Sequence, residues 1–335
     1  SYYSVVGGWV LHYIFLSFQN SFAGRTPDET TGLFSALQAA PLQQLLWHAV
    51  FMLLTITIVA GGIHEGIEMG NKIMMPLLFL LLCALLIYAV QTQGAKGGID
   101  FLMRPRWQDL SPIAVLDALG QALFSLSLGM GAMITYGSYL GKETNLVRSA
   151  FWVAGGDTLV AILAGFVVFP LVFTFNLEPT GGPGLLFRTL PVAFGQLPAG
   201  QLVALAFFLL LGFAALTSSI SLLEVVSAYF IDEHGWSRKQ ASWILGGIIF
   251  LLGIPSAFWE RFFGLMDGLA TNYLLPIGAF LIALFAGWVL SHKERREEFH
   301  RGEIRTLPYL GWSLVVRYIS PVAVALIFPH QLGIF

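Results

Sequence analysis

Long apolar stretches separated by short polar segments run along the whole chain. Each stretch is close to or longer than the ~20 residues that a helix needs to cross a bilayer. The pattern therefore predicts an all-α polytopic membrane protein with about nine transmembrane helices. The predicted spans are residues 2–21, 43–62, 73–92, 113–140, 149–174, 201–231, 240–257, 264–290 and 307–328.

The composition agrees with this class of protein. Hydrophobic residues make up 56% of the chain and charged residues 11%, and the mean hydropathy is +0.76. These values lie far from those of soluble domains, so we expect the lipid bilayer to be the main surroundings. The net charge of −2, with no basic patch among aromatic residues, argues against nucleic acid as a partner.

The polar connections carry information about orientation and topology. The basic segment KERREEFHR at 293–301 predicts that the loop 291–306 is cytoplasmic. Residues 22–42 and 175–200 are rich in Pro, Gly and Thr but keep apolar residues. We expect both connections to fold against the protein.

The stretch 113–140 carries small and polar residues at mid-span, namely Ser125, Ser127, Gly129 and Gly131. A transmembrane helix that breaks exposes backbone groups that hydrocarbon cannot satisfy, so the break must face a ligand, an ion or a water-filled cavity. Composition alone leaves a second interpretation open, a continuous helix whose small residues let a neighbour pack closely.

Acids and hydroxyls inside the spans are candidate ligands. Asp157 lies nine residues beyond Arg148, which places it ~13 Å into the membrane at 1.5 Å per residue. A bare carboxylate at that depth costs about 2.5–3.5 kcal/mol, so we expect it to meet a cation or a proton, unless it is protonated or paired within its helix. The hydroxyls in TSSIS at 217–221 either bond back to carbonyls one turn earlier or bind a hard cation. Glu224 is assigned no role.

Two segments resemble enzyme motifs, but each lacks one residue that the motif requires. HEGIE at 64–68 has Glu68 where a zinc-protease helix needs its second histidine. GMGAMI at 129–134 has Ile134 in place of the last glycine of a dinucleotide fingerprint. We expect the protein not to be an enzyme.

From its start to its end the chain resembles helices three to eleven of the neurotransmitter:sodium symporters, including their bacterial sodium-dependent amino-acid transporters. GQALFSLSLGMGAMITYGSYL at 120–140 resembles the broken sixth helix, and Gly66 and Pro76 reproduce a Gly-(nine residues)-Pro spacing in the fifth. The resemblance implies one membrane domain, 1–335, with an incomplete LeuT-like inverted-repeat fold. Residues 1–92 would be the remnant of the first repeat (helices three to five), 113–290 the second repeat (helices six to ten) and 307–328 helix eleven.

The resemblance also assigns site residues. The implied substrate-binding residues are Tyr3, Phe124, Ser127, Gly129, Met130 and Leu222, with the Tyr3 hydroxyl on the substrate carboxylate and Phe124 as a lid. The implied sodium ligands are Ser125 and Asp157 in a first site and Ala214, Thr217 and Ser218 in a second. Asp267 resembles the outer-gate acid and Asp232 the inner-gate acid, while Gly66 and Pro76 mark where helix five unwinds.

Departures from the family qualify these expectations. The sequence has no counterpart of the family's helices one and two. We therefore expect residues 1–335 alone neither to bind amino acid tightly nor to transport it, unless another segment supplies those helices. Ala161 stands where relatives have a chloride-binding serine or a compensating acid. With Asp157 one helical turn away, no chloride requirement is expected.

The function implied is sodium-coupled symport of an apolar or aromatic amino acid by alternating access, in the cytoplasmic membrane of a prokaryote. Two alternatives stay open. One is a receptor-like or accessory membrane subunit that does not transport. The other is a proton-coupled amino-acid carrier in which Asp157 binds the proton.

Overall fold

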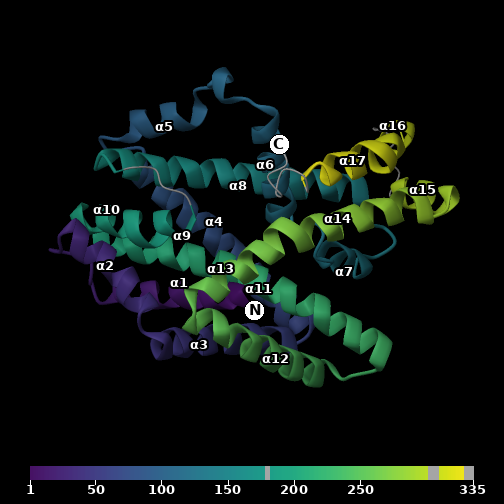
Figure 1. Cartoon of the computed structure of the whole chain (residues 1–335), viewed down its shortest axis with the longest axis horizontal. Helices are drawn as coiled ribbons and strands as arrows, with labels where there is room; N and C mark the ends of the chain where they lie inside the picture. Colours follow the sequence, from purple (N-terminus) through teal and green to yellow (C-terminus); the bar gives the residue numbers. More distant parts are fainter. Residues whose placement is uncertain (178–181, 301–308, 328–335) are drawn as a thin grey trace. The chain divides into compact units, whose positions relative to one another are not determined.

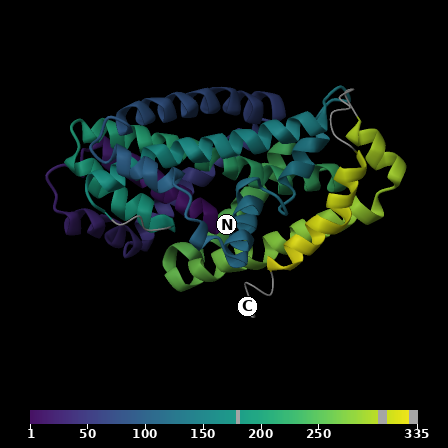
Figure 2. The same ribbon diagram turned by 90° about the horizontal axis from the view of Figure 1, so that it is seen from above.

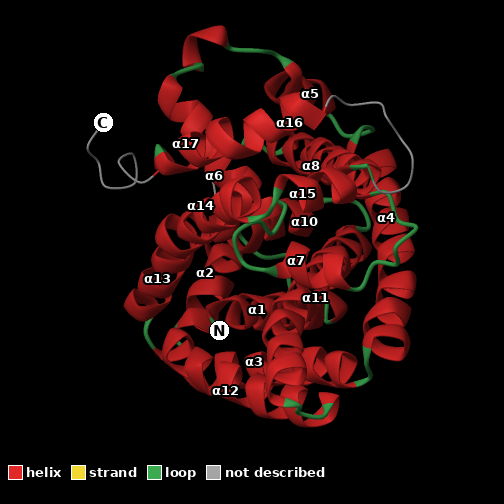
Figure 3. Ribbon diagram, turned by 90° about the vertical axis from the view of Figure 1, so that its right-hand side faces the viewer, coloured by secondary structure: helices red, strands yellow, loops and turns green. Residues whose placement is uncertain are grey.

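The structure, a computed structural model, describes residues 1–177, 182–300 and 309–327. Within these ranges the chain forms helices joined by loops, and no strand occurs among them (Figure 3). The chain divides into two compact units. The first comprises Ser1–Arg104 and Ala161–Gly264, and the second comprises Pro105–Val160 and Leu265–Phe335.

The first unit is built around α1 (Figure 1). Its helices are α1 (Tyr2–Phe18), α2 (Pro27–Gln38), α3 (Pro41–Ala60), η1 (Ile63–Glu68), α4 (Met69–Ala89), α5 (Ala95–Met103), α9 (Gly182–Gly184), η3 (Leu185–Thr189), α10 (Leu190–Gln196), α11 (Gly200–His234) and α12 (Arg238–Phe258). The later part of α8 (Leu146–Thr174) and the first residues of α13 (Glu260–Gly268) also belong to it.

Small residues let α1 pack closely on its neighbours α3, α11 and α12. A Cβ atom at Gly7 would lie 2.4 Å from the Phe51 ring, and one at Gly8 would lie 2.7 Å from the His48 backbone nitrogen. Helices in lipid associate mainly by van der Waals packing, which such close approach strengthens. The two glycines therefore hold α1 against α3.

The continuous helical segment formed by α9, η3 and α10 folds onto α1 and α2. The Tyr13 hydroxyl of α1 donates a hydrogen bond of 2.8 Å to the Phe187 carbonyl. The rings of Phe34 and Phe187 stack with their centroids 5.2 Å apart. The prediction that the connection 175–200 folds against the protein is confirmed for its described residues, while 178–181 lie outside them.

The second unit contains the broken helix. Its elements are η2 (Trp107–Asp109), α6 (Pro112–Ser125), α7 (Ala132–Ser138), the first part of α8, the end of α13, η4 (Leu269–Leu274), α14 (Leu275–Leu284), η5 (Phe285–Val289), α15 (His292–Phe299), α16 (Tyr309–Leu314), η6 (Val315–Ile319) and α17 (Ser320–Ala325). α14 and α17 run side by side and both contact α6 (Figure 2).

Six helical segments of the described residues are long and apolar enough to cross a membrane: Pro41–Ala60, Ile63–Ala89, Leu146–Thr174, Gly200–His234, Arg238–Phe258 and Glu260–Val289. Pro112–Ser125 and Tyr309–Ala325 are shorter apolar helices. Each of these overlaps a predicted span.

One predicted boundary is wrong. The helix expected to begin at residue 73 begins at Ile63. The polar residues 63–72 lie outside the predicted apolar span. His64 and Lys72 each pair with Glu68 across one turn, at 2.8 and 2.7 Å. Such pairs four residues apart favour helix, so the polar segment continues the apolar one.

Candidate functional site

The predicted break in the sixth helix is present in the structure. α6 ends at Ser125 and α7 begins at Ala132. Between them Ser127, Gly129 and Gly131 have φ angles of 54°, 85° and 85°. Left-handed backbone at three of five successive residues ends the helix, and it is readily adopted only by glycine. The interpretation as a continuous helix is therefore wrong for this stretch.

The broken segment lies directly against α14. A Cβ atom at Gly129 would lie 2.3 Å from the Leu275 carbonyl oxygen, and one at Gly278 would lie 2.0 Å from the Gly129 carbonyl oxygen. The two backbones thus touch with no side chain between them. This contact fixes the break on one side. The N–H groups of Gly129 and Met130 have no hydrogen-bond partner among the described residues.

Ser125 and Asp157 lie next to each other at the end of α6. The Ser125 hydroxyl lies 2.7 Å from Oδ1 and 2.8 Å from Oδ2 of Asp157, to which it donates. Ser125 is exposed and Asp157 is half-buried. Because the serine proton points at the carboxylate, the serine lone pairs remain free. The negative end of the α6 dipole adds to the carboxylate charge, so this point attracts a cation.

A second group of oxygens gathers on α11, in the first unit. The hydroxyls of Thr217 and Ser218 both donate to the Ala214 carbonyl, at 2.9 and 3.1 Å. The Tyr3 hydroxyl of α1 lies near the Ser218 hydroxyl. Leu222 lies one turn further along α11 and is 36% exposed. The hydroxyls therefore bond back to a carbonyl, as one of the two interpretations held, yet their lone pairs still face an accessible side of the helix.

The structure thus brings the implied residues together in two groups. Tyr3, Ala214, Thr217, Ser218 and Leu222 belong to the first unit, and Phe124, Ser125, Ser127, Gly129, Met130 and Asp157 belong to the second. Phe124 is 38% exposed and Met130 is half-buried. Each group is contiguous within its own unit.

The expected gate acids and the helix-five residues lie outside these groups. Asp232, near the end of α11, and Asp267, in α13, are exposed, and neither forms a salt bridge with a described residue. Gly66 lies in the π-helical turn η1, where a Cβ atom would meet the Ile58 carbonyl oxygen at 2.0 Å. Pro76 lies inside α4, which continues on both sides of it. A π-helical turn and an internal proline both make a helix irregular.

Sequence reasoning missed one buried ion pair. Glu224 of α11 is 0% exposed and accepts two hydrogen bonds from Arg238 of α12, at 2.7 and 3.0 Å. The available signal was the short connection after His234, where Gly235 adopts a φ of 66° and turns the chain back. Such a turn brings the start of α12 alongside the last part of α11.

Comparisons with known proteins identify the family. The sequence pattern of the sodium:neurotransmitter symporter family matches residues 37–334. YhdH, an uncharacterized sodium-dependent transporter of Bacillus subtilis, is 39% identical over 346 residues, which cover 100% of this chain and 77% of that protein. An uncharacterized sodium-dependent transporter of Haemophilus influenzae is 35% identical over 348 residues, or 99% of this chain and 76% of that protein.

A solved structure is similar as well. The crystal structure of MhsT in complex with L-phenylalanine matches with a TM-score of 0.88 and 43% identity, over 98% of this chain and 77% of that one. The predicted LeuT-like fold, incomplete in this chain, is confirmed by this match. The protein is a multi-pass membrane protein of a transporter family and not an enzyme. The chain belongs to the sodium:neurotransmitter symporter family.

Proposed function

We propose that this chain forms the larger part of a sodium-coupled symporter for apolar or aromatic amino acids. The observation that carries the proposal is the contact of Ser125 with Asp157 where α6 breaks. Hard cations such as sodium prefer oxygen ligands, and this point offers two carboxylate oxygens and a hydroxyl with free lone pairs. The names of the similar bacterial proteins, which are sodium-dependent transporters, support the choice of ion.

The amino-acid substrate is supported by the broken segment and by the similar structure. Half-helix ends and freed backbone groups are the usual ligands of small zwitterions and ions at the middle of a transporter. MhsT, whose structure this chain resembles, was crystallised with L-phenylalanine. In the proposal, Phe124, Ser127 and Met130 line the side-chain pocket and the Tyr3 hydroxyl meets the carboxylate.

Alternating access follows from a difference in affinity between two states. Sodium at the Asp157 site and at the α11 hydroxyls would stabilise the outward-open state, and amino acid would then favour closure. Inward opening, with unwinding of helix five between Gly66 and Pro76, would release both solutes. The gate acids Asp267 and Asp232 would close the outer and inner paths.

The test is uptake of labelled leucine or phenylalanine by the full-length protein in proteoliposomes. We expect uptake with an inward sodium gradient and none when choline replaces sodium. Asp157→Asn should abolish this uptake, while Asp100→Asn, which changes an exposed acid of α5, should leave it intact. Equal uptake in sodium and in choline would refute sodium coupling.

The same carboxylate favours one second candidate, a proton-coupled carrier. A proton on Asp157 would neutralise it as a cation does, and the Ser125 hydroxyl would then accept a hydrogen bond instead of donating one. In that case an inward proton gradient should drive uptake without sodium, and external pH should set the rate.

A further inference from the structure

Two arginines donate to the same carbonyl oxygen where the helical segment α14–η5 ends beside the segment α16–α17. The Gly287 carbonyl, near the end of η5, accepts a hydrogen bond of 2.8 Å from Nε of Arg317. It also accepts one from Arg295 of α15. Positive side chains commonly cap the last carbonyls of a helix, and this accounts for one nitrogen of each arginine.

Capping leaves most of this positive charge uncompensated. Arg295 is only 5% exposed, and its Nε has no hydrogen-bond partner. Among the described residues no carboxylate forms a salt bridge with Arg295 or Arg317. The nearby acids are engaged elsewhere, since Glu294 caps α15 through Ser291 and Glu297 lies 3.9 Å from Lys293. Two guanidinium groups that share one carbonyl oxygen create a positive potential that would stabilise a bound anion.

Aromatic side chains mark this end as the border between hydrocarbon and water. The Arg317 guanidinium lies over the Trp288 ring, 5.0 Å from its centroid, and Trp288 and Tyr318 are each 52% exposed. Tryptophan and tyrosine concentrate at the level of lipid headgroups. The terminal nitrogens of the half-buried Arg317 therefore lie within reach of a lipid phosphate.

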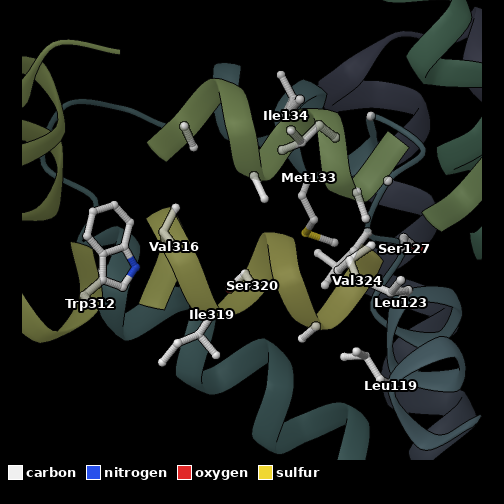
Figure 4. A pocket seen from close by; sticks show the side chains of 18 residues that line it. Leu119, Leu123, Ser127, Met133, Ile134, Trp312, Val316, Ile319, Ser320 and Val324 are labelled. Carbon is white, nitrogen blue, oxygen red and sulfur yellow. The ribbon is translucent and has the colours of Figure 1, made fainter. Parts of the chain in front are cut away.

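The second unit contains an apolar pocket of about 500 Å³ (Figure 4). Trp312 and Val316 lie at one end of it, and Ser127 of the broken segment and Leu123 of α6 lie at the other. Ala286 and Val316, the neighbours of Gly287 and Arg317 in the chain, both line it. Apart from Ser127, Ser320 and the Trp312 indole, its lining side chains are apolar.

Such a cavity favours hydrocarbon over water. Water needs two to four polar partners to remain bound, so this half-open pocket with an apolar lining accommodates hydrocarbon better than water. An empty space costs its lining the dispersion contacts of the missing atoms. A volume of this size is in the range of pockets that enclose small ligands. In a membrane, the abundant apolar molecule is the lipid acyl chain.

We propose that an anionic glycerophospholipid binds here, with its phosphate on Arg317 and Arg295 and one acyl chain in the cavity. Basic pockets between transmembrane helices are known sites for anionic headgroups. The lipid acyl chain would reach Ser127, Gly129 and Gly131. The lipid would therefore support the broken segment on the side where this segment meets α14. The proposal does not depend on which solute the protein transports.

Native mass spectrometry of the full-length protein, titrated with phosphatidylglycerol, tests the proposal. Phosphatidylcholine with the same acyl chains tests the need for negative charge, and glycerol phosphate tests whether free phosphate suffices. We expect phosphatidylglycerol to bind at least about fivefold more tightly than phosphatidylcholine, since one basic residue near the surface contributes about that much. Equal binding of the two lipids, or binding of glycerol phosphate as tight as that of the lipid, overturns the proposal.

Matched variants test each half of the site. Arg317→Gln should weaken phosphatidylglycerol binding by about fivefold, and Arg317→Lys should weaken it less. Lys293→Gln, an exposed charge outside the site, should change nothing. Ala323→Leu narrows the cavity and should weaken binding, whereas Val322→Leu on the exposed face of α17 should not. If Arg317→Gln and Lys293→Gln behave alike, the headgroup site is wrong. If both leucine variants bind like the parent, the acyl chain does not occupy the cavity.

Discussion

At the scale of single residues, Asp157 combines two properties that rarely occur together inside a membrane. It is half-buried, and it accepts a hydrogen bond from a hydroxyl that keeps its own lone pairs available. A carboxylate kept only for packing would be expected to pair with a base or to sit at an exposed helix end. In the proposed function Asp157 is a sodium ligand, and its charge is the property that a variant should change.

Replacing Asp157 by Asn keeps the shape and removes the charge. We expect Asp157→Asn to abolish sodium-driven uptake, and a double variant with Ala161→Ser to recover it only when chloride is present. A bound anion would then supply the missing negative charge one helical turn away. Uptake by purified protein in chloride-free and chloride-containing buffer is the measurement. Normal transport by Asp157→Asn without chloride would leave the carboxylate a structural role only.

Ser218 tests the second ion site. Ser218 lies near the Tyr3 hydroxyl and donates to the Ala214 carbonyl. Ser221, one turn further along α11, donates to the Thr217 carbonyl. Loss of one oxygen from a charged ligand costs about 1.5–3 kcal/mol, so Ser218→Ala should raise the sodium concentration for half-maximal uptake by about tenfold or more. Ser221→Ala is the control and should shift it little. Equal shifts in both variants would indicate a general effect on α11.

At the scale of elements, prolines explain several irregular turns. Three π-helical turns end two residues before a proline: η3 before Pro191, η4 before Pro276 and η6 before Pro321. Proline lacks the N–H group, and its ring presses on the carbonyl one turn earlier, so the preceding turn widens. The prolines are visible in the sequence. Whether a helix breaks or only widens there depends on neighbours that satisfy the freed carbonyls, which the sequence does not show.

The elements and the site differ in how far the sequence predicts them. Spans follow from apolar length, because the bilayer imposes the same requirement on every helix. The break at 126–131 was predictable from serines and glycines only as one of two interpretations, since the same residues also suit close packing. The contact of Ser125 with Asp157 was expected from family resemblance and is present. The pair Glu224–Arg238 was not expected, because it depends on how α12 turns back along α11.

The break itself can be tested through glycine. Gly129→Ala places a methyl group at a φ of 85° and 2.3 Å from the Leu275 carbonyl oxygen. The backbone strain alone costs about 1–3 kcal/mol, so we expect a lower melting temperature and loss of uptake. Gly137→Ala is the matched control in α7, because its Cβ atom would meet nothing within 4 Å. That variant should keep or slightly raise stability. Equal behaviour of the two variants would contradict the contact with α14.

The ion pair between α11 and α12 predicts a second change in stability. Glu224→Gln leaves Arg238 partly buried without its carboxylate, and breaking such a pair costs about 3–5 kcal/mol. Because the Arg238 side chain is 22% exposed, we expect the lower end of that range. Glu233→Gln, an exposed acid on α11, should have no effect on the melting temperature. If the double variant Glu224→Leu with Arg238→Met is no more stable than Glu224→Gln, the penalty does not come from an unpaired charge.

At the scale of the whole molecule, the two groups of implied site residues belong to different compact units. In the proposed function, alternating access requires parts of the protein to move around a bound solute. In the proposed function, the second unit would contribute Asp157 and Ser125 as ion ligands, and the first unit would contribute oxygens of α11. The proposed ligands are therefore distributed over both units, so the substrate class has to be tested on the full-length protein.

The substrate is expected to be apolar or aromatic, because none of the implied pocket residues is an acid or a base that could pair a charged side chain. Met130 is unbranched and polarizable, and Gly129 and Gly131 flank it, so the pocket can adjust to side chains of different bulk. In competition assays on the full-length protein, Leu, Met, Phe, Tyr or Trp should therefore compete better than Glu, Asp, Lys and Arg. Met130→Ile stiffens the same position and should narrow the accepted range, weakening Trp relative to Leu, whereas Met103→Ile on exposed α5 should not. A charged amino acid as the best competitor would refute the substrate class, and an unchanged Trp-to-Leu ratio in Met130→Ile would remove Met130 from the pocket.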